Sequence, residues 1–199
     1  MTTPILALLD EIRAIGQLGL NYSEDPFDRE RYERLLRLAS KEYAAISGLP
    51  ESEVDAFFRR ELGYITPKTG CNAAIFNPQG HVLLVKRSDN GLWCLPGGFA
   101  EVNMSPQENC RREVWEETGL EVEVGDLVDV FYTLPGQYGL PNTVYILVYL
   151  CSVTGGTLTP SHETPMVGFY DHTTVTNWHT NHFDRVERAY RYWIKHYRL

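Results

Sequence analysis

Residues 98–120 read GFAEVNMSPQENCRREVWEETGL, and this stretch carries signals for both ends of one helix. Ser105 is a preferred N-cap residue, Pro106 suits the first helical position, and Glu108 completes an S-x-x-E capping box. Gly119 can adopt the left-handed conformation that often ends a helix. The sequence therefore predicts a helix between Ser105 and Gly119.

Three glutamates fall on one face of that helix. At about 100° per residue, Glu113, Glu116 and Glu117 lie within an arc of roughly 100°. Cys110 and Val114 lie beside this face and supply an apolar stripe for packing against a sheet. The carboxylates are therefore expected along the edge of a buried seam, where their mutual repulsion is stronger than in bulk water.

A divalent cation is the usual remedy for such a cluster, because like charges in a medium of low dielectric raise one another's pKa. Oxygen ligands favour magnesium or manganese, which take a few carboxylates and complete their shells with water and substrate phosphate. The alternative interpretation is a solvated acidic face paired with Arg111 and Arg112, a common role for charge runs on helices.

The sequence predicts helices in the first part of the chain. In the rest it predicts strands around the helix between Ser105 and Gly119. Apolar periodicity indicates helices over 5–17, 26–47 and 51–62, with Gly19, Gly48 and Gly63 near their ends. Strands are expected at 73–76, 81–86, 121–133, 143–153 and 166–170, the first two forming a hairpin, followed by a helix at 183–196. The predicted fold class is α+β, with a helical domain over residues 1–63 and a second domain over 66–199.

Composition and charge narrow the class of protein. The chain has 199 residues, of which 43% are hydrophobic and 22% charged, as in ordinary folded domains. A formal net charge of -8 disfavours a long polyphosphate partner, so DNA binding is not expected. No run approaches the roughly eighteen apolar residues of a membrane span, and the first residues include no basic leader. The four scattered cysteines suit reduced thiols, and a cytoplasmic location is expected.

The stretch resembles the Nudix box, G-x5-E-x7-R-E-U-x-E-E-x-G-U with U aliphatic, at Gly98, Arg112, Glu113, Val114, Glu116, Glu117, Gly119 and Leu120. Outer segments, including GYITPK, LLVKR, WCLPGGFAEV and GGTLTPSHET, are similar to Nudix hydrolases with an N-terminal helical domain, of the ADP-ribose or CDP-choline pyrophosphatase kind. The resemblance implies an α/β/α sandwich with a mixed sheet. It also implies Mg²⁺-dependent hydrolysis of a nucleoside diphosphate derivative to a nucleoside monophosphate and a phosphorylated second group.

Two positions depart from the family pattern. Met104 stands where the box has its first glutamate, and a thioether is too soft a ligand for magnesium. Glu101, three residues earlier, is a candidate replacement, while a loop residue packed at the helix start is the simpler interpretation of Met104. Asn72 stands where the resembling subgroup usually has arginine, so a different substrate preference is expected if that arginine grips phosphate.

The resemblance also implies roles for individual residues. The metal is expected to be held by Glu113, Glu116, Glu117 and Gly98, where the glycine pair Gly97 and Gly98 permits close backbone approach. The candidate catalytic residues are Glu113, Glu116, Arg112 and Glu163. Arg112 is expected to orient a glutamate as a bidentate pair, and the general base is Glu116 or the loop residue Glu163. Loop glutamates are often only solvated. The candidates for substrate contact are Phe99, Glu101, Trp93 and Tyr132, with Tyr138 as a further stacking surface.

Two other functions stay open from the sequence. One is removal of pyrophosphate from RNA 5′ ends, which the acidic charge balance disfavours. The other is a non-catalytic Nudix ligand sensor, since one fold can serve unrelated functions. Retention of the three glutamates favours an enzyme. The helical domain is expected to form a homodimer, because its apolar stripes, including Phe57 and Phe58, require burial.

Overall fold

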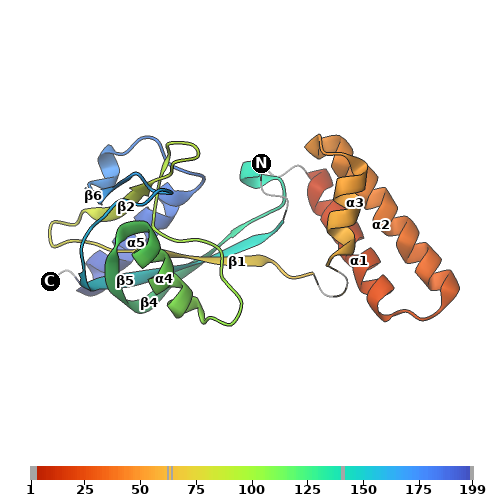
Figure 1. The fold of residues 1–199 in the computed structure, drawn as a ribbon, viewed down its shortest axis with the longest axis horizontal. Helices are drawn as coiled ribbons and strands as arrows, with labels where there is room; N and C mark the ends of the chain where they lie inside the picture. The colour runs from red at the N-terminus through yellow and green to blue at the C-terminus, as the bar shows by residue number, and fades with distance from the viewer. Residues whose placement is uncertain (1–3, 62, 64, 140–141, 198–199) are drawn as a thin grey trace. The chain divides into compact units, whose positions relative to one another are not determined.

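The computed structural model describes residues 4–61, 63, 65–139 and 142–197. They form two compact units (Figure 1). The helical unit extends to Pro67 and includes residues 133–143, while the sheet unit comprises 68–132 and 144 onward. The sequence did not place 133–143 with the helices. Within the described ranges, no helix is long and apolar enough to cross a membrane.

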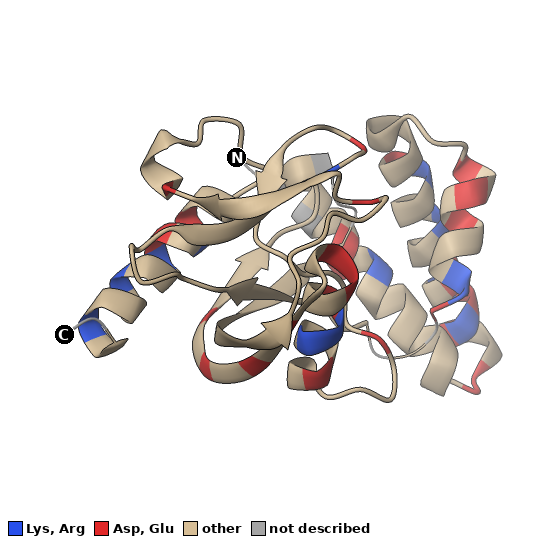
Figure 2. Ribbon diagram, turned by 60° about the vertical axis from the view of Figure 1, so that its left-hand side comes forward, with Lys and Arg blue, Asp and Glu red and all other residues tan. Residues whose placement is uncertain are grey.

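The helical unit consists of α1 (Pro4–Tyr22), α2 (Pro26–Ser47) and α3 (Glu51–Arg59). The side chain of Asp25 caps α2 by accepting from two backbone N–H groups, and Gly48 ends it with φ of 72°. The shared core of the three helices contains Leu6, Leu9, Leu20, Leu36, Ala39, Tyr43, Ala44, Val54 and Phe58. Charged residues of both signs follow the length of α2 (Figure 2).

Gly19 lies in the last turn of α1, near the helix end as predicted, because α1 continues to Tyr22. A Cβ atom at Gly19 would lie 2.3 Å from ring atoms of Tyr32 on α2. The glycine therefore permits a close approach of α1 and α2, and this packing function cannot be distinguished from a cap by its position in the sequence.

The sheet unit contains two three-stranded sheets. In the first, β1 (Lys68–Ala74) pairs in parallel with β5 (Val144–Gly156), which neighbours β4 (Leu120–Thr133). In the second, β2 (Val82–Lys86) pairs antiparallel with β3 (Trp93–Cys94) and β6 (Met166–Tyr170). The expected hairpin is present as a turn at 77–80 with a single bridge between Phe76 and Val82, but its two strands belong to different sheets.

Two helices cover the sheets. One core cluster joins Cys110 and Val114 of α4 (Pro106–Thr118) to Cys71 and Ala73 of β1. Another contains Val186 and Ala189 of α5 (His182–Tyr197) together with residues of β1, β2 and β5. These contacts give the expected α/β/α sandwich with both parallel and antiparallel pairing (Figure 1). All four cysteines are buried free thiols, as expected.

Helix α4 begins and ends as its sequence predicts. The Ser105 hydroxyl accepts from the Glu108 N–H, the Glu108 carboxylate accepts from the Ser105 N–H, and Gly119 follows the helix with φ of 71°. The glutamate face is therefore fixed in register by strong local signals at both ends.

We expect Ser105→Ala to lower the free energy of unfolding by about 1 kcal/mol, because the substitution removes the side chain that caps α4. Urea unfolding monitored by circular dichroism measures this change. The matched control is Gln107→Ala, an exposed substitution in the first turn of the same helix. Equal stability of Ser105→Ala and Gln107→Ala would show that the cap contributes nothing.

Candidate active site

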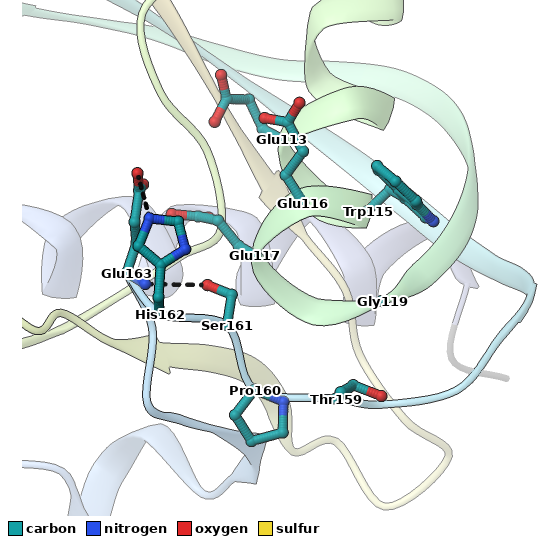
Figure 3. A pocket seen from close by; sticks show the side chains of 10 residues that line it. All are labelled: Glu113, Trp115, Glu116, Glu117, Gly119, Thr159, Pro160, Ser161, His162 and Glu163. Atoms are coloured by element: carbon teal, nitrogen blue, oxygen red, sulfur yellow. Dashed lines mark hydrogen bonds and ion pairs between the residues drawn. The ribbon is translucent and has the colours of Figure 1, made fainter.

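One cavity of about 420 Å³ lies between the C-terminal half of α4 and the loop that follows β5. It is lined by Glu113, Trp115, Glu116, Glu117, Gly119, Thr159, Pro160, Ser161, His162 and Glu163. Figure 3 shows Glu117 pointing from α4 toward Glu163 and His162 on the loop, while Glu113 and Glu116 lie further along the helix. Four of the predicted carboxylates therefore border one cavity, although Glu163 lies 43 positions beyond the end of the box in sequence.

Arg112 contacts three carboxylates, two of which line this cavity. One terminal nitrogen of its guanidinium lies 3.0 Å from both Glu113 and Glu101, and the other donates to Glu116 at 3.2 Å. This arrangement differs from the expected bidentate pair, because the two nitrogens serve different carboxylates. The guanidinium therefore holds Glu101, Glu113 and Glu116 close together and offsets part of their repulsion.

Glu117 is held by the backbone of the loop between β3 and α4. The N–H of Gly97 donates to Glu117 Oε2 at 2.8 Å. Burial raises the pKa of Glu117 to about 8, and the hydrogen bond from Gly97 offsets only part of this effect. Burial also raises the pKa of Glu113, against the opposing charge of Arg112. The carboxylates of Glu113 and Glu163 further raise the pKa of Glu117.

The glycine pair permits this close packing. A Cβ at Gly97, whose φ is 145°, would lie 2.1 Å from the Cys71 carbonyl oxygen. A Cβ at Gly98 would lie 2.7 Å from a carboxylate oxygen of Glu113. The carbonyl oxygen of Gly98 accepts from the Cys71 N–H at 2.9 Å, so β1 already engages the one oxygen atom that Gly98 could offer to a metal. That role of Gly98 stays a prediction.

The structure does not bring the predicted aromatic residues to the cavity. Trp93 packs against Tyr170 with ring centroids 4.6 Å apart and carries Lys86 over its face. Phe99 and Tyr132 are exposed but do not line the cavity, and Tyr138 belongs to the helical unit. Their substrate-binding roles therefore stay predictions. Trp115, which is not among the predicted substrate contacts, is 59% exposed and lines the cavity.

The two departures from the family pattern have different surroundings. Met104 is 41% exposed, and nearby Glu101 pairs with Arg112 outside the cavity lining. Asn72 is buried on β1, and its side-chain oxygen accepts from the guanidinium of Arg185 at 2.7 Å. Helix α5 therefore supplies a buried guanidinium next to Asn72, the position at which the resembling subgroup usually has arginine.

The donor set fits a hard divalent cation. Burial raises the pKa values of the Glu113 and Glu117 carboxyls, and magnesium or manganese binds oxygen ligands of this kind. Among the residues that the structure describes, no group of three His, Cys, Asp or Glu side chains is arranged to hold a metal ion. The metal-ligand roles of Glu113, Glu116 and Glu117 therefore stay predictions.

Comparison with known proteins identifies the family. Residues 66–192 match the NUDIX domain, and residues 3–58 match the UDP-X-like N-terminal oligomerisation domain. The chain is 36% identical over 172 residues to YjhB of Bacillus subtilis (strain 168), which carries the provisional name of ADP-ribose pyrophosphatase; the match covers 84% of this chain and 81% of that protein.

Two solved structures are also similar. A UDP-X diphosphatase superposes with a TM-score of 0.60 and 29% identity, covering 97% of this chain and 95% of the other. An ADP-ribose pyrophosphatase from Streptococcus suis gives a TM-score of 0.55 and 32% identity, covering 64% and 92%. The chain belongs to the NUDIX family and is a Nudix hydrolase with an N-terminal domain of the oligomerisation type.

We expect Glu117→Gln to stabilise the metal-free protein at alkaline pH. The folded-state pKa of about 8 lies above the ordinary value of 4.5, so the stability associated with this carboxyl is present below pH 4.5 and is lost as the pH rises through 8. The loss is at most about 1.4 kcal/mol for each pH unit in that interval. Urea unfolding in EDTA at pH 5 and pH 8 should therefore show a difference between variant and wild type that grows with pH.

The matched control for this measurement is Glu123→Gln, which neutralises an exposed carboxylate on β4. Its difference from the wild type should change little with pH. If the Glu117→Gln difference were also the same at pH 5 and pH 8, burial would not raise the pKa of Glu117.

Proposed function

We propose that this Nudix hydrolase uses magnesium to cleave the diphosphate of a nucleoside diphosphate linked to a second group. Water supplies the attacking oxygen, and the products are a nucleoside monophosphate and the phosphorylated second group. The observation that carries the proposal is the gathering of Glu113, Glu116, Glu117 and Glu163 around one cavity, where burial and the neighbouring carboxylates raise the pKa of Glu117 and a dication would offset the negative charge.

Glu113, Glu116 and Glu117 are the residues that would hold the cation. When bound, a hard dication neutralises charge on the diphosphate oxygens and on the leaving phosphate. Arg112 positions Glu113 and Glu116, and the Gly97 N–H positions Glu117. These side chains are thereby oriented before substrate arrives.

Glu163 is the better placed of the two candidate general bases. The carboxylate of Glu116 is paired with Arg112, and this pairing favours its use as an oriented ligand. Glu163 lies on the opposite wall of the cavity, is 71% exposed, and has His162 at 3.4 Å. We assign it the removal of a proton from the attacking water.

The similar proteins support one class of substrate. The names of the relatives mention ADP-ribose and UDP-X, which are both nucleoside diphosphates carrying a second group. We therefore propose this class, with CDP-choline as a further member to be tested. The retained glutamates support catalysis over a sensor role, and the net charge of -8 weighs against RNA 5′ ends. A cytoplasmic location stays a prediction.

We predict that Glu117→Gln and Glu113→Gln each lower metal-dependent turnover by at least about 100-fold, because each removes an oriented anionic ligand. The assay is hydrolysis in magnesium or manganese of ADP-ribose, UDP-sugars, CDP-choline and 5′-triphosphorylated RNA, with both products identified. Glu123→Gln serves as the charge-matched control and should keep wild-type turnover.

Identification of both products separates the proposed reaction from its rivals. If 5′-triphosphorylated RNA were the only substrate hydrolysed, with release of inorganic pyrophosphate, the result would instead support an RNA end-processing enzyme. Binding of nucleotides without turnover by the wild type would support a sensor. Full turnover by Glu117→Gln at saturating magnesium would remove the metal assignment.

We further propose that the helical unit forms a homodimer. Its match to an oligomerisation domain supports self-association, and α1 offers a surface for it. Leu8 and Ile15 are 54% and 46% exposed and lie seven residues apart, on the same side of that helix. Burial of such a stripe against a second copy would remove apolar surface from water.

The paired substitution Leu8→Asp and Ile15→Asp should dissociate the dimer, since two carboxylates would then be buried in an apolar contact. Light scattering after size-exclusion chromatography measures the molar mass. Lys41→Glu, an exposed change on α2, is the control and should leave the mass unchanged. An unaltered dimer mass in the double variant would exclude this stripe as the interface.

A further inference from the structure

The loop that carries Glu163 also caps the C-terminus of α4. The last carbonyl groups of a helix have no partner within the helix and require one from elsewhere. Here the Thr159 N–H donates to the Thr118 carbonyl at 2.8 Å, and the Thr157 N–H donates to the Gly119 carbonyl at 3.2 Å. The third contact comes from a side chain, because the Thr164 hydroxyl donates to the Glu117 carbonyl at 2.7 Å.

The hydroxyl of Thr164 has a defined hydrogen-bonding role. Thr164 is 2% exposed, and its single O–H proton is used on the Glu117 carbonyl. The neighbouring hydroxyl of Ser161, at 2.9 Å, must therefore be the donor in the contact between the two. The Ser161 oxygen in turn accepts from the N–H groups of Glu163 and Thr164 at 3.3 and 3.1 Å.

The main chain of Glu163 is consequently fixed on two sides. Its carbonyl accepts from the Ser88 N–H at 2.8 Å, just beyond β2, and its N–H donates to Ser161. Thr164 joins this short turn to the residue on α4 whose carboxylate lies across the cavity. The same side chain thereby sets the separation of Glu163 from Glu117.

We propose that Thr164 is a positioning residue, which holds Glu163 at its working distance from the carboxylates of α4 by bonding the loop to the Glu117 carbonyl. The inference rests on the proposed function, because it takes Glu163 as the proton acceptor. Loss of the hydroxyl leaves the Glu117 carbonyl buried without its donor, and the turn that carries Glu163 then loses its side-chain hydrogen bond to the helix. Substrate affinity, which does not require the proton acceptor, should change little.

Four variants test the proposal, namely Thr164→Val, Thr164→Ser, Glu163→Gln and the double variant Thr164→Val with Glu163→Gln. Valine matches threonine in shape but lacks the hydroxyl, whereas serine retains it. We expect Thr164→Val to lower kcat about 10-fold with KM within about 2-fold. Thr164→Ser should recover most of kcat. In the Glu163→Gln background, Thr164→Val should lower kcat no further, because the residue through which it acts has already been lost.

Hydrogen exchange gives a second readout that does not depend on turnover. Amides within 157–164 should exchange faster in Thr164→Val than in the wild type, while Thr157→Val, an exposed change in the same loop, should leave them protected. If Thr164→Val fails to fold, Thr164→Ser and Ser161→Ala supply the hydroxyl-dependent comparison.

Each outcome of these measurements either supports or overturns the proposal. Multiplicative losses in the double variant, or unchanged exchange within 157–164, would overturn the positioning role while leaving the proposed reaction intact. Full activity of Glu163→Gln would overturn the assignment of Glu163 and the route through which Thr164 acts. Failure of the wild type to hydrolyse any nucleotide would instead defeat the proposed function, even if the exchange data showed that the hydroxyl fastens the loop.

Discussion

The hydrogen bond from the Gly97 N–H to the Glu117 carboxylate is the interaction on which the site depends most. It requires the backbone to pass so close to β1 that a Cβ at Gly97 would lie 2.1 Å from the Cys71 carbonyl oxygen. The same passage places Gly98 against the Glu113 carboxylate. Only glycine satisfies both demands, so the pair joins the sheet, the loop and the acidic helix in one rigid arrangement.

Electrostatics explains why this arrangement is suited to a cation. Arg112 forms ion pairs with Glu101, Glu113 and Glu116. Glu117 instead accepts a hydrogen bond from a single backbone N–H, which lowers its pKa by less than burial raises it. The apolar contacts of Cys110 and Val114 hold the helix against the sheet and so maintain the carboxylates in surroundings of reduced dielectric. The apolar packing of α4 thus keeps the carboxylates close together, although their mutual repulsion is unfavourable without a bound cation.

Local sequence signals predicted the helix, its caps and its glutamate face, because capping and periodicity act over a few residues. They also indicated the strand Met166–Tyr170, which is present at those limits. Features that depend on distant contacts were not accessible in this way. The close approach to Tyr32 that Gly19 permits was not predicted, because nothing near Gly19 in sequence reveals Tyr32. The packing of Trp93 against Tyr170 is also a tertiary contact, so Trp93 was taken for a stacking surface. The capping of α4 by 157–164 is likewise invisible until the chain folds.

Calorimetric titration of manganese into the metal-free protein at pH 7, in two buffers of different ionisation enthalpy, tests the central claim directly. Because the pKa of Glu117 is about 8 without a cation, the carboxyl is largely protonated at this pH and must release its proton to become a ligand. We predict binding accompanied by release of close to one proton per chain, and loss of that release in Glu117→Gln. Absence of binding, or binding with no proton released by the wild type, would contradict the claim.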